Sequence, residues 1–199
     1  EQGKGANQEK LFGKVTTLVL AGLGFIWLIL MLWTDDFIQL KIMGYSFFGE
    51  EFQNSIPIVP WIAMGYLFYG FYVLQTPGIF LKDRPGIAAW TRLLGATSNI
   101  IFCFIFIPLY GAIGAAMATC FAFFLMLVMM YWWNTKLYPI RLEWRKISFI
   151  TIILISGFFI SRASADNLFI NILITGLYPV GLIGLGIIKM DSLKSRVAD

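Results

Sequence analysis

The fold of this chain is decided by residues 85–133, which read PGIAAWTRLLGATSNIIFCFIFIPLYGAIGAAMATCFAFFLMLVMMYWW. Two apolar runs, each long enough to cross a bilayer as a helix, meet at the tight connection of residues 107–111, which contains Pro108. Proline lacks a backbone N–H and disfavours helical geometry at the preceding Ile107, so it predicts the end of the first helix. Gly111 and Gly114 open the second helix with almost no side-chain bulk. The stretch therefore predicts a membrane helical hairpin with a short turn.

The composition of the whole chain indicates the same lipid environment. Hydrophobic residues make up 59% and charged residues 13% of the 199 residues, and the mean hydropathy is +0.78. That is too little charge to cover the surface of a water-soluble globule. In lipid, packing between helices rather than exclusion of water determines the core. The composition therefore predicts an all-α integral membrane protein.

Apolar runs of spanning length recur along the sequence. Since a spanning helix needs about 20 mostly apolar residues, we predict six transmembrane helices, at residues 11–33, 56–81, 87–107, 112–133, 147–161 and 168–188. They form a polytopic membrane domain, residues 11–188, between a polar cytoplasmic tether (1–10) and a cytoplasmic tail (189–199). Residues 34–55 combine acids with apolar side chains, which indicates a segment lying in the membrane interface.

The distribution of Lys and Arg predicts the orientation, because these residues favour the cytoplasmic side. With a cytoplasmic N-terminus and alternating helices, 13 of the 15 Lys and Arg residues fall inside, and only Lys41 and Arg162 fall outside. The opposite orientation would invert this bias, so both termini are predicted to be cytoplasmic. The net charge of +4 then reflects topology and attraction to anionic lipid, and not nucleic-acid binding.

Polar residues inside the predicted helices are candidates for substrate binding, because lipid does not solvate them. Arg92 lies about 10 Å along its helix from Pro85 and could bind a lipid phosphate, or could reach back to the headgroups. Asn99, two turns further on the same face, could contact a sugar hydroxyl or form an interhelical hydrogen bond. In the preceding helix, Tyr69 and Tyr72 share a face and could stack on a sugar or serve as ordinary core residues.

Small residues and a Pro-Gly pair have mainly structural interpretations. Gly114 and Ala118, like Gly111 and Ala115, are four residues apart, a spacing that lets two helix backbones approach closely. We therefore assign these four residues to helix packing within the hairpin. Adjacent residues in the second predicted helix, Pro77 and Gly78, could act as a hinge or merely produce a fixed kink.

The sequence lacks the residues that most enzyme and metal sites use. It contains no His, and both cysteines, Cys103 and Cys120, fall inside predicted helices at different depths. The predicted helices hold no pair of carboxylates, and no Ser/His/Asp arrangement or phosphate-binding glycine loop is present. We therefore expect no metal, no cofactor and no enzymatic activity.

Four pieces of the sequence carry a family resemblance. They are FFGEEF at 47–52, IVP at 58–60, LKDRP at 81–85, and Asn99 followed by IPLYGAIGAAMAT at 107–119. Together they resemble the C-terminal domain of polysaccharide biosynthesis proteins. These are the O-antigen-type and lipid-linked oligosaccharide flippases of the multidrug/oligosaccharidyl-lipid/polysaccharide exporter superfamily. The last piece is the most specific, and the resemblance covers about half of the chain.

The resemblance implies that the six helices form most of the C-terminal lobe of a two-lobed exporter. We would then expect the chain to be the C-terminal piece of a flippase in the bacterial inner membrane. Such a protein translocates undecaprenyl-diphosphate-linked oligosaccharide for surface polysaccharide synthesis, including lipopolysaccharide O-antigen. Its implied partners are that lipid, membrane lipids and an N-terminal lobe outside this chain. The family often places charged residues in its central cavity, and here only Arg92 is a candidate.

Three alternatives remain open at this point. A multidrug or small-cation exporter of the same fold would need buried acids, which the predicted helices lack. A membrane enzyme of polysaccharide assembly would be expected to show large outer loops or catalytic His, Asp or Arg residues. A non-catalytic packing subunit would be complete with six helices.

Overall fold

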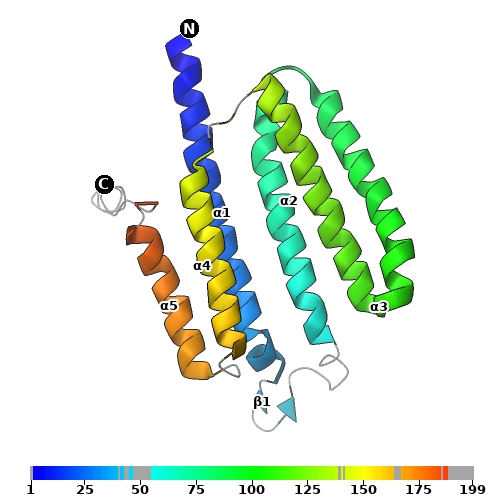
Figure 1. The fold of residues 1–199 in the computed structure, drawn as a ribbon, viewed down its shortest axis with the longest axis vertical. Helices are drawn as coiled ribbons and strands as arrows, with labels where there is room; N and C mark the ends of the chain where they lie inside the picture. The colour runs from blue at the N-terminus through cyan, green and yellow to red at the C-terminus, as the bar shows by residue number, and fades with distance from the viewer. Residues whose placement is uncertain are drawn as a thin grey trace.

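A computed structural model describes residues 2–39, 41–42, 45–46, 55–138, 140, 142–163, 167–184 and 186–187. The helices in this part of the chain are α1 (Gln2–Gln39), α2 (Val59–Phe80), α3 (Pro85–Leu137), α4 (Trp144–Ala163) and α5 (Leu168–Gly184). They lie side by side along one long axis (Figure 1). Two short strands, β1 (Lys41–Ile42) and β2 (Tyr45–Ser46), pair antiparallel after α1. Apart from this ribbon, the regular structure of the described residues is helical.

Helix α3 folds back on itself to form the predicted hairpin (Figure 1). Its backbone leaves helical geometry only at Gly111, where φ is 57° and ψ is −130°. Residues 85–110 form the first arm and residues 112–137 the second arm. The prediction that Pro108 ends the first helix is wrong, because helical geometry continues through Ile107 and Pro108. Membrane helices tolerate proline when local adjustments satisfy the freed carbonyl group, whereas the positive φ of the turn requires glycine.

The helix boundaries differ from the predicted ones mostly at the ends. The predicted tether, residues 1–10, is helical from Gln2 onward, because Gln, Lys, Ala and Glu favour helix formation. The first part of the predicted interfacial segment forms the last turns of α1 and the strands β1 and β2. Its residues 47–54 lie outside the described part. Helix α4 is longer than predicted and α5 ends earlier. The predicted tail, residues 189–199, also lies outside the described part.

Four helical stretches are long and apolar enough to cross a membrane: Leu11–Gln39, Ser55–Phe80, Pro85–Leu137 and Trp144–Ser161. A fifth, Leu168–Gly184, is apolar but shorter. Large apolar side chains cover the outside of the bundle, with Phe104 79% and Phe169 73% exposed, as lipid contact requires. The chain is therefore an α-helical, multi-pass membrane protein. The count of six spans, which treats the arms of α3 separately and includes α5, stays a prediction.

Basic residues of the connections gather at one end of the bundle, which we call the basic end. The N-terminus, the α2–α3 connection, the α3–α4 connection and the end of α5 lie there (Figure 1). Two of its lysines lie over aromatic rings: Lys136 Nζ is 3.6 Å from the Trp132 ring centroid and Lys82 Nζ is 6.0 Å from that of Tyr138. Such pairs of cation and aromatic ring are typical of a membrane interface. The side of the membrane that this end faces stays a prediction.

The buried apolar residues form two clusters, and α2 contributes to both. The first cluster joins α1, α4 and α5 and contains Ala21, Trp27, Leu28, Leu32, Ile150, Leu154, Tyr178 and Leu182. The second cluster joins α2 and α3 and contains Tyr72, Ile79, Ala88, Met126, Leu127 and Met130. Met64 and Leu67 of α2 pack on the first cluster, whereas Phe68 and Phe71 pack on the second. Helix α2 therefore packs against both clusters.

Candidate functional site

Helix α2 presents a stripe of polar side chains to α3. Tyr69, Tyr72 and Gln75 are three residues apart and therefore lie near one face of the helix. The rings of Tyr69 and Tyr72 stack with their centroids 5.8 Å apart. Arg92, from the first arm of α3, donates a hydrogen bond from Nε to the Tyr72 hydroxyl, at 3.2 Å. Three of the four residues predicted to bind substrate thus come together, and we call them the Arg92 cluster.

The guanidinium of Arg92 retains most of its capacity to bind an anion. It carries five N–H donors, of which the structure uses one on Tyr72. In the described part of the chain it has no carboxylate within salt-bridge distance, since the salt bridge found there joins Lys146 and Glu143 at 2.9 Å. The Arg92 residue is exposed, while Tyr72 is fully buried and orients it. The arrangement is suited to a phosphate or a carboxylate.

Asn99 does not join this cluster. Its Nδ2 donates to Thr119 Oγ1 on the second arm of α3 at 3.2 Å, and the Cys103 thiol lies 3.8 Å from its Oδ1. Thr119 in turn donates to the carbonyl oxygen of Ala115 at 3.2 Å. Asn99 therefore ties the two arms of α3 together. This geometry fits the interhelical hydrogen bond rather than the sugar contact.

Sequence reasoning missed a pair of buried amides at the basic end of the polar stripe. Gln75 is 1% and Asn134 2% exposed. Asn134 Nδ2 donates to the backbone oxygen of Gln75 at 2.8 Å and to its Oε1 at 3.4 Å. Gln75 Nε2 and Asn134 Oδ1 have no hydrogen-bond partner among the described residues. The one sequence signal was the position of Gln75, three residues after Tyr72, because Asn134 follows two tryptophans and resembles an ordinary interfacial residue.

The small residues assigned to packing have different roles. Gly114 and Ala118 are buried in the hairpin, and a methyl group on Gly114 would overlap the carbonyl oxygen of Phe106 in the first arm. Ala115 is half-buried and supplies the carbonyl group that accepts from Thr119. Gly111 differs from the prediction, because no atom lies within 4 Å of where its Cβ would be. It contributes the positive φ of the turn and not a close contact.

Pro77 and Gly78 lie within α2, and the second of them makes a close contact. The helix runs from Val59 to Phe80 and includes both residues. A Cβ on Gly78 would lie 2.9 Å from Asn134 Oδ1 and 3.1 Å from the ring of Tyr138. Gly78 therefore makes room for the buried amide. Its role as a hinge with Pro77 stays a prediction.

Replacing Gly78 with alanine is expected to destabilise the protein by about 1–3 kcal/mol, because the added methyl group would push on Asn134. Thermal unfolding of the detergent-solubilised protein measures this loss. Gly86→Ala is the matched control, since nothing lies within 4 Å of a Cβ at that exposed position. Equal melting temperatures for Gly78→Ala and the wild type would show that the contact is not tight.

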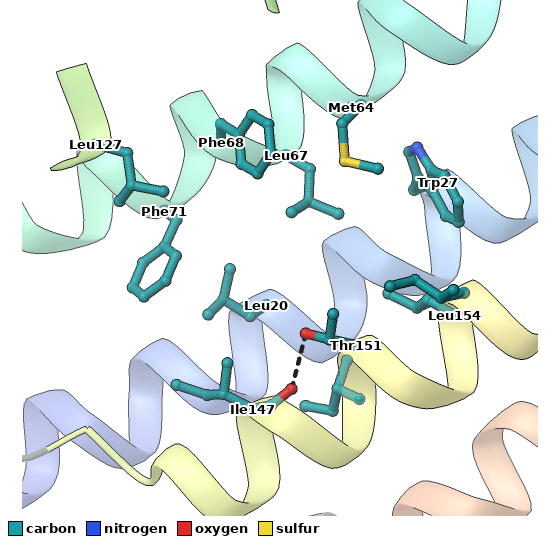
Figure 2. Close-up of a pocket in the computed structure, with 12 residues that line it drawn as sticks. Leu20, Trp27, Met64, Leu67, Phe68, Phe71, Leu127, Ile147, Thr151 and Leu154 are labelled. Atoms are coloured by element: carbon teal, nitrogen blue, oxygen red, sulfur yellow. Dashed lines mark hydrogen bonds between the residues drawn. The ribbon is translucent and has the colours of Figure 1, made fainter. Parts of the chain in front are cut away.

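Helix α2 also borders an apolar cavity of about 320 Å³ (Figure 2). Leu67, Phe68 and Phe71 of α2 face Leu20 of α1 across it (Figure 2). The Thr151 hydroxyl in its wall donates to the carbonyl oxygen of Ile147 at 2.9 Å, so it is satisfied. An apolar space of this kind stays dry and suits a hydrocarbon chain. The polar stripe and the apolar cavity are thus both bordered by α2.

Comparison with known proteins gives the class of this protein but not its activity. No family model matches the chain. An uncharacterized membrane protein of Methanocaldococcus jannaschii is 26% identical over 164 residues, which are 76% of this chain and 31% of that protein. The chain thus spans about a third of the length of this relative. No solved structure matches the chain. This similarity and the apolar helices both indicate a multi-pass membrane protein.

Proposed function

We propose that this protein is the C-terminal part of a flippase for lipid-linked oligosaccharide in the bacterial inner membrane. The observation that carries the proposal is the Arg92 cluster, in which the arginine of an apolar helix is held by a buried tyrosine. A charged head rich in hydroxyl groups cannot cross hydrocarbon unaided. Arg92 supplies fixed donors for its diphosphate, and the ring of Tyr69 supplies a surface on which a sugar can stack.

In this proposal the two parts of the substrate follow different surfaces. The undecaprenyl tail stays in lipid, and the apolar cavity beside α2 offers a further place for hydrocarbon. The head moves past the Arg92 cluster as six helices of this lobe and those of a second lobe alternate between inward-open and outward-open states. The basic end faces the cytoplasm, where anionic headgroups attract its lysines and arginines. No covalent bond changes, so the proposed function requires no catalytic residue or cofactor.

The exporter of small cations receives less support from the structure. A cation inside a membrane protein is normally balanced by a buried acid. The buried polar residues in the described part of the chain are Thr16, Thr17, Gln75, Thr91, Asn134, Ser161 and Asn171. None of these is a carboxylate, whereas the Arg92 cluster is suited to an anion.

Expression of the protein in a bacterial strain that lacks its own flippase tests the proposal, with surface polysaccharide as the readout. The wild type is expected to restore the polysaccharide. Arg92→Gln is expected to lower it about tenfold or more, since a charge-assisted hydrogen bond to phosphate is lost. Arg92→Lys keeps the charge but not the fork of donors, and is expected to give an intermediate level.

Arg84→Gln is the control, because Arg84 is exposed in the α2–α3 connection and lies outside the Arg92 cluster. All variants are compared at equal amounts in the membrane fraction. Full polysaccharide with Arg92→Gln would remove Arg92 from the mechanism. A wild-type protein that reaches the membrane but restores no polysaccharide would contradict the proposed function itself.

A further inference from the structure

We infer that Gln75 and Asn134 form a second polar subsite, which binds a hydroxyl group of a ligand head. The inference deepens the proposed function, on which it rests for the source of that hydroxyl. The two side chains come from α2 and from the second arm of α3, and both are almost completely buried. They lie at the basic end of the stripe that begins with Tyr69 and Tyr72.

The hydrogen bonds of the pair determine which groups remain available. Asn134 Nδ2 donates to Gln75 twice, to the backbone oxygen at 2.8 Å and to Oε1 at 3.4 Å. These bonds hold both side chains in place and occupy the donors of Asn134 and the side-chain acceptor of Gln75. One donor, Gln75 Nε2, and one acceptor, Asn134 Oδ1, remain buried without a partner among the described residues. Buried amide groups are rarely left unpaired, so a ligand or water is expected to pair with them.

A pocket of about 160 Å³ adjoins the two amides. It is also lined by Tyr131, Thr135, Ile140 and Leu142, at the end of α3 and the start of the connection to α4. Since a water molecule takes about 30 Å³, the space is several times larger than one water needs. Gly78 leaves room for the Asn134 side chain, because a Cβ there would lie 2.9 Å from Asn134 Oδ1.

The two unpaired atoms determine which functional group of a ligand can bind there. A phosphate or an ether oxygen only accepts hydrogen bonds and would leave Asn134 Oδ1 unpaired, whereas an ammonium group only donates and would leave Gln75 Nε2 unpaired. An alcohol hydroxyl accepts and donates at a single atom, and so satisfies both. Gln75 lies three residues from Tyr72, or about 4.5 Å along the helix axis. A sugar hydroxyl and a phosphate of one head could therefore occupy neighbouring positions.

Binding to the purified protein in phosphatidylcholine nanodiscs tests the inference without any transport. The probes are octyl β-glucopyranoside, which presents hydroxyls, and an octyl oligoethylene glycol methyl ether, which only accepts hydrogen bonds. Tryptophan emission reports binding, since Trp132 and Trp133 precede Asn134 and Trp144 contacts Tyr131, with ring centroids 5.6 Å apart. The wild type is expected to bind the glucoside about tenfold more tightly than the ether, as a pair of buried hydrogen bonds would give.

A substitution at Gln75 tests whether the amide pair causes the preference for the glucoside over the ether. Gln75→Met removes Nε2 at similar length and is expected to abolish the preference for the glucoside. Gln39→Met makes the same change at the exposed end of α1 and is expected to bind like the wild type. Equal binding of both probes by the wild type would overturn the inference and leave water as the occupant. This comparison needs no variant, so it holds even if Gln75→Met does not fold.

A third probe separates two sources of the hydroxyl. Dihexanoyl-phosphatidylglycerol presents a glycerol head instead of a sugar. Tighter binding of the glucoside supports a glycan ligand, whereas tighter binding of phosphatidylglycerol, lost in Gln75→Met, supports the subsite but assigns it to a membrane lipid. Because these measurements involve no flux, they remain valid if the complementation experiment contradicts the flippase.

Discussion

Gly114→Ala is expected to prevent the two arms of α3 from closing and to remove most of the folded protein. A methyl group at this position would overlap the carbonyl oxygen of Phe106 and lie 2.9 Å from the backbone nitrogen of Ile107. Side chains can rotate away from such a contact, but backbone atoms cannot. We therefore expect a loss of about 3 kcal/mol or more, the upper end of the range for overpacking. That is a large share of the 5–15 kcal/mol by which proteins are typically stable.

Size-exclusion yield and thermal unfolding in detergent measure the effect. Gly176→Ala in α5 is the matched control, because it makes the same change in a helix where nothing lies within 4 Å of the new Cβ. Its stability is expected to stay equal or rise by about 0.5–1 kcal/mol, since alanine favours the helix more than glycine does. A Gly114→Ala protein that melts like the wild type would contradict the close approach of the two arms.

Reporter proteins fused to the connections between helices are expected to show that each connection lies entirely on one side of the membrane. A fusion after Arg84 and a fusion after Glu143 should both be cytoplasmic, whereas a fusion at Gly111 should lie outside. The first two sites lie at the basic end, and the third lies at the opposite end of the bundle (Figure 1). Each Lys or Arg near an anionic surface contributes about 1 kcal/mol, so the orientation is strongly biased.

Alkaline phosphatase, which is active only outside, and green fluorescent protein, which is fluorescent inside, give opposite signals at each site. A fusion at Ser46, after the ribbon that follows α1, should behave like the fusion at Gly111. Phosphatase activity after Arg84 or Glu143 would reverse the orientation. It would also contradict the flippase, because the basic end would then face away from the side where the sugar lipid is made.

The hairpin and its short connection at residues 107–111 were predictable from the sequence, whereas the residue at which the backbone turns was not. Two apolar runs around a Pro and Gly pair sufficed to predict two arms, because few other arrangements bury such runs in lipid. Pro108 is the stronger helix breaker in water, yet the chain turns at Gly111. A membrane helix can include a proline near its end, whereas the combination of φ 57° and ψ −130° found at the turn favours glycine.

The candidate site was predictable residue by residue but not as an arrangement. Arg92, Tyr69 and Tyr72 stood out because each is polar inside an apolar helix, but their contact depends on how α2 and α3 pack. Asn99 shared the helical face of Arg92 and nevertheless bonds to the other arm. Gln75 and Asn134 are 59 residues apart in the sequence, and no local pattern relates them. Their pairing is a result of tertiary packing, about which one sequence gives little information.

The position of α2 between the two core clusters has a thermodynamic consequence. This helix borders the apolar cavity and also carries the stacked tyrosines that orient Arg92. A tilt of α2 would change the volume of the cavity and shift the hydrogen-bonding groups of the stripe. Filling the cavity with hydrocarbon would then change the affinity for an anion, and the anion would change the affinity for hydrocarbon by the same factor. The binding of the tail and the binding of the head of one amphiphile would thus influence each other through α2.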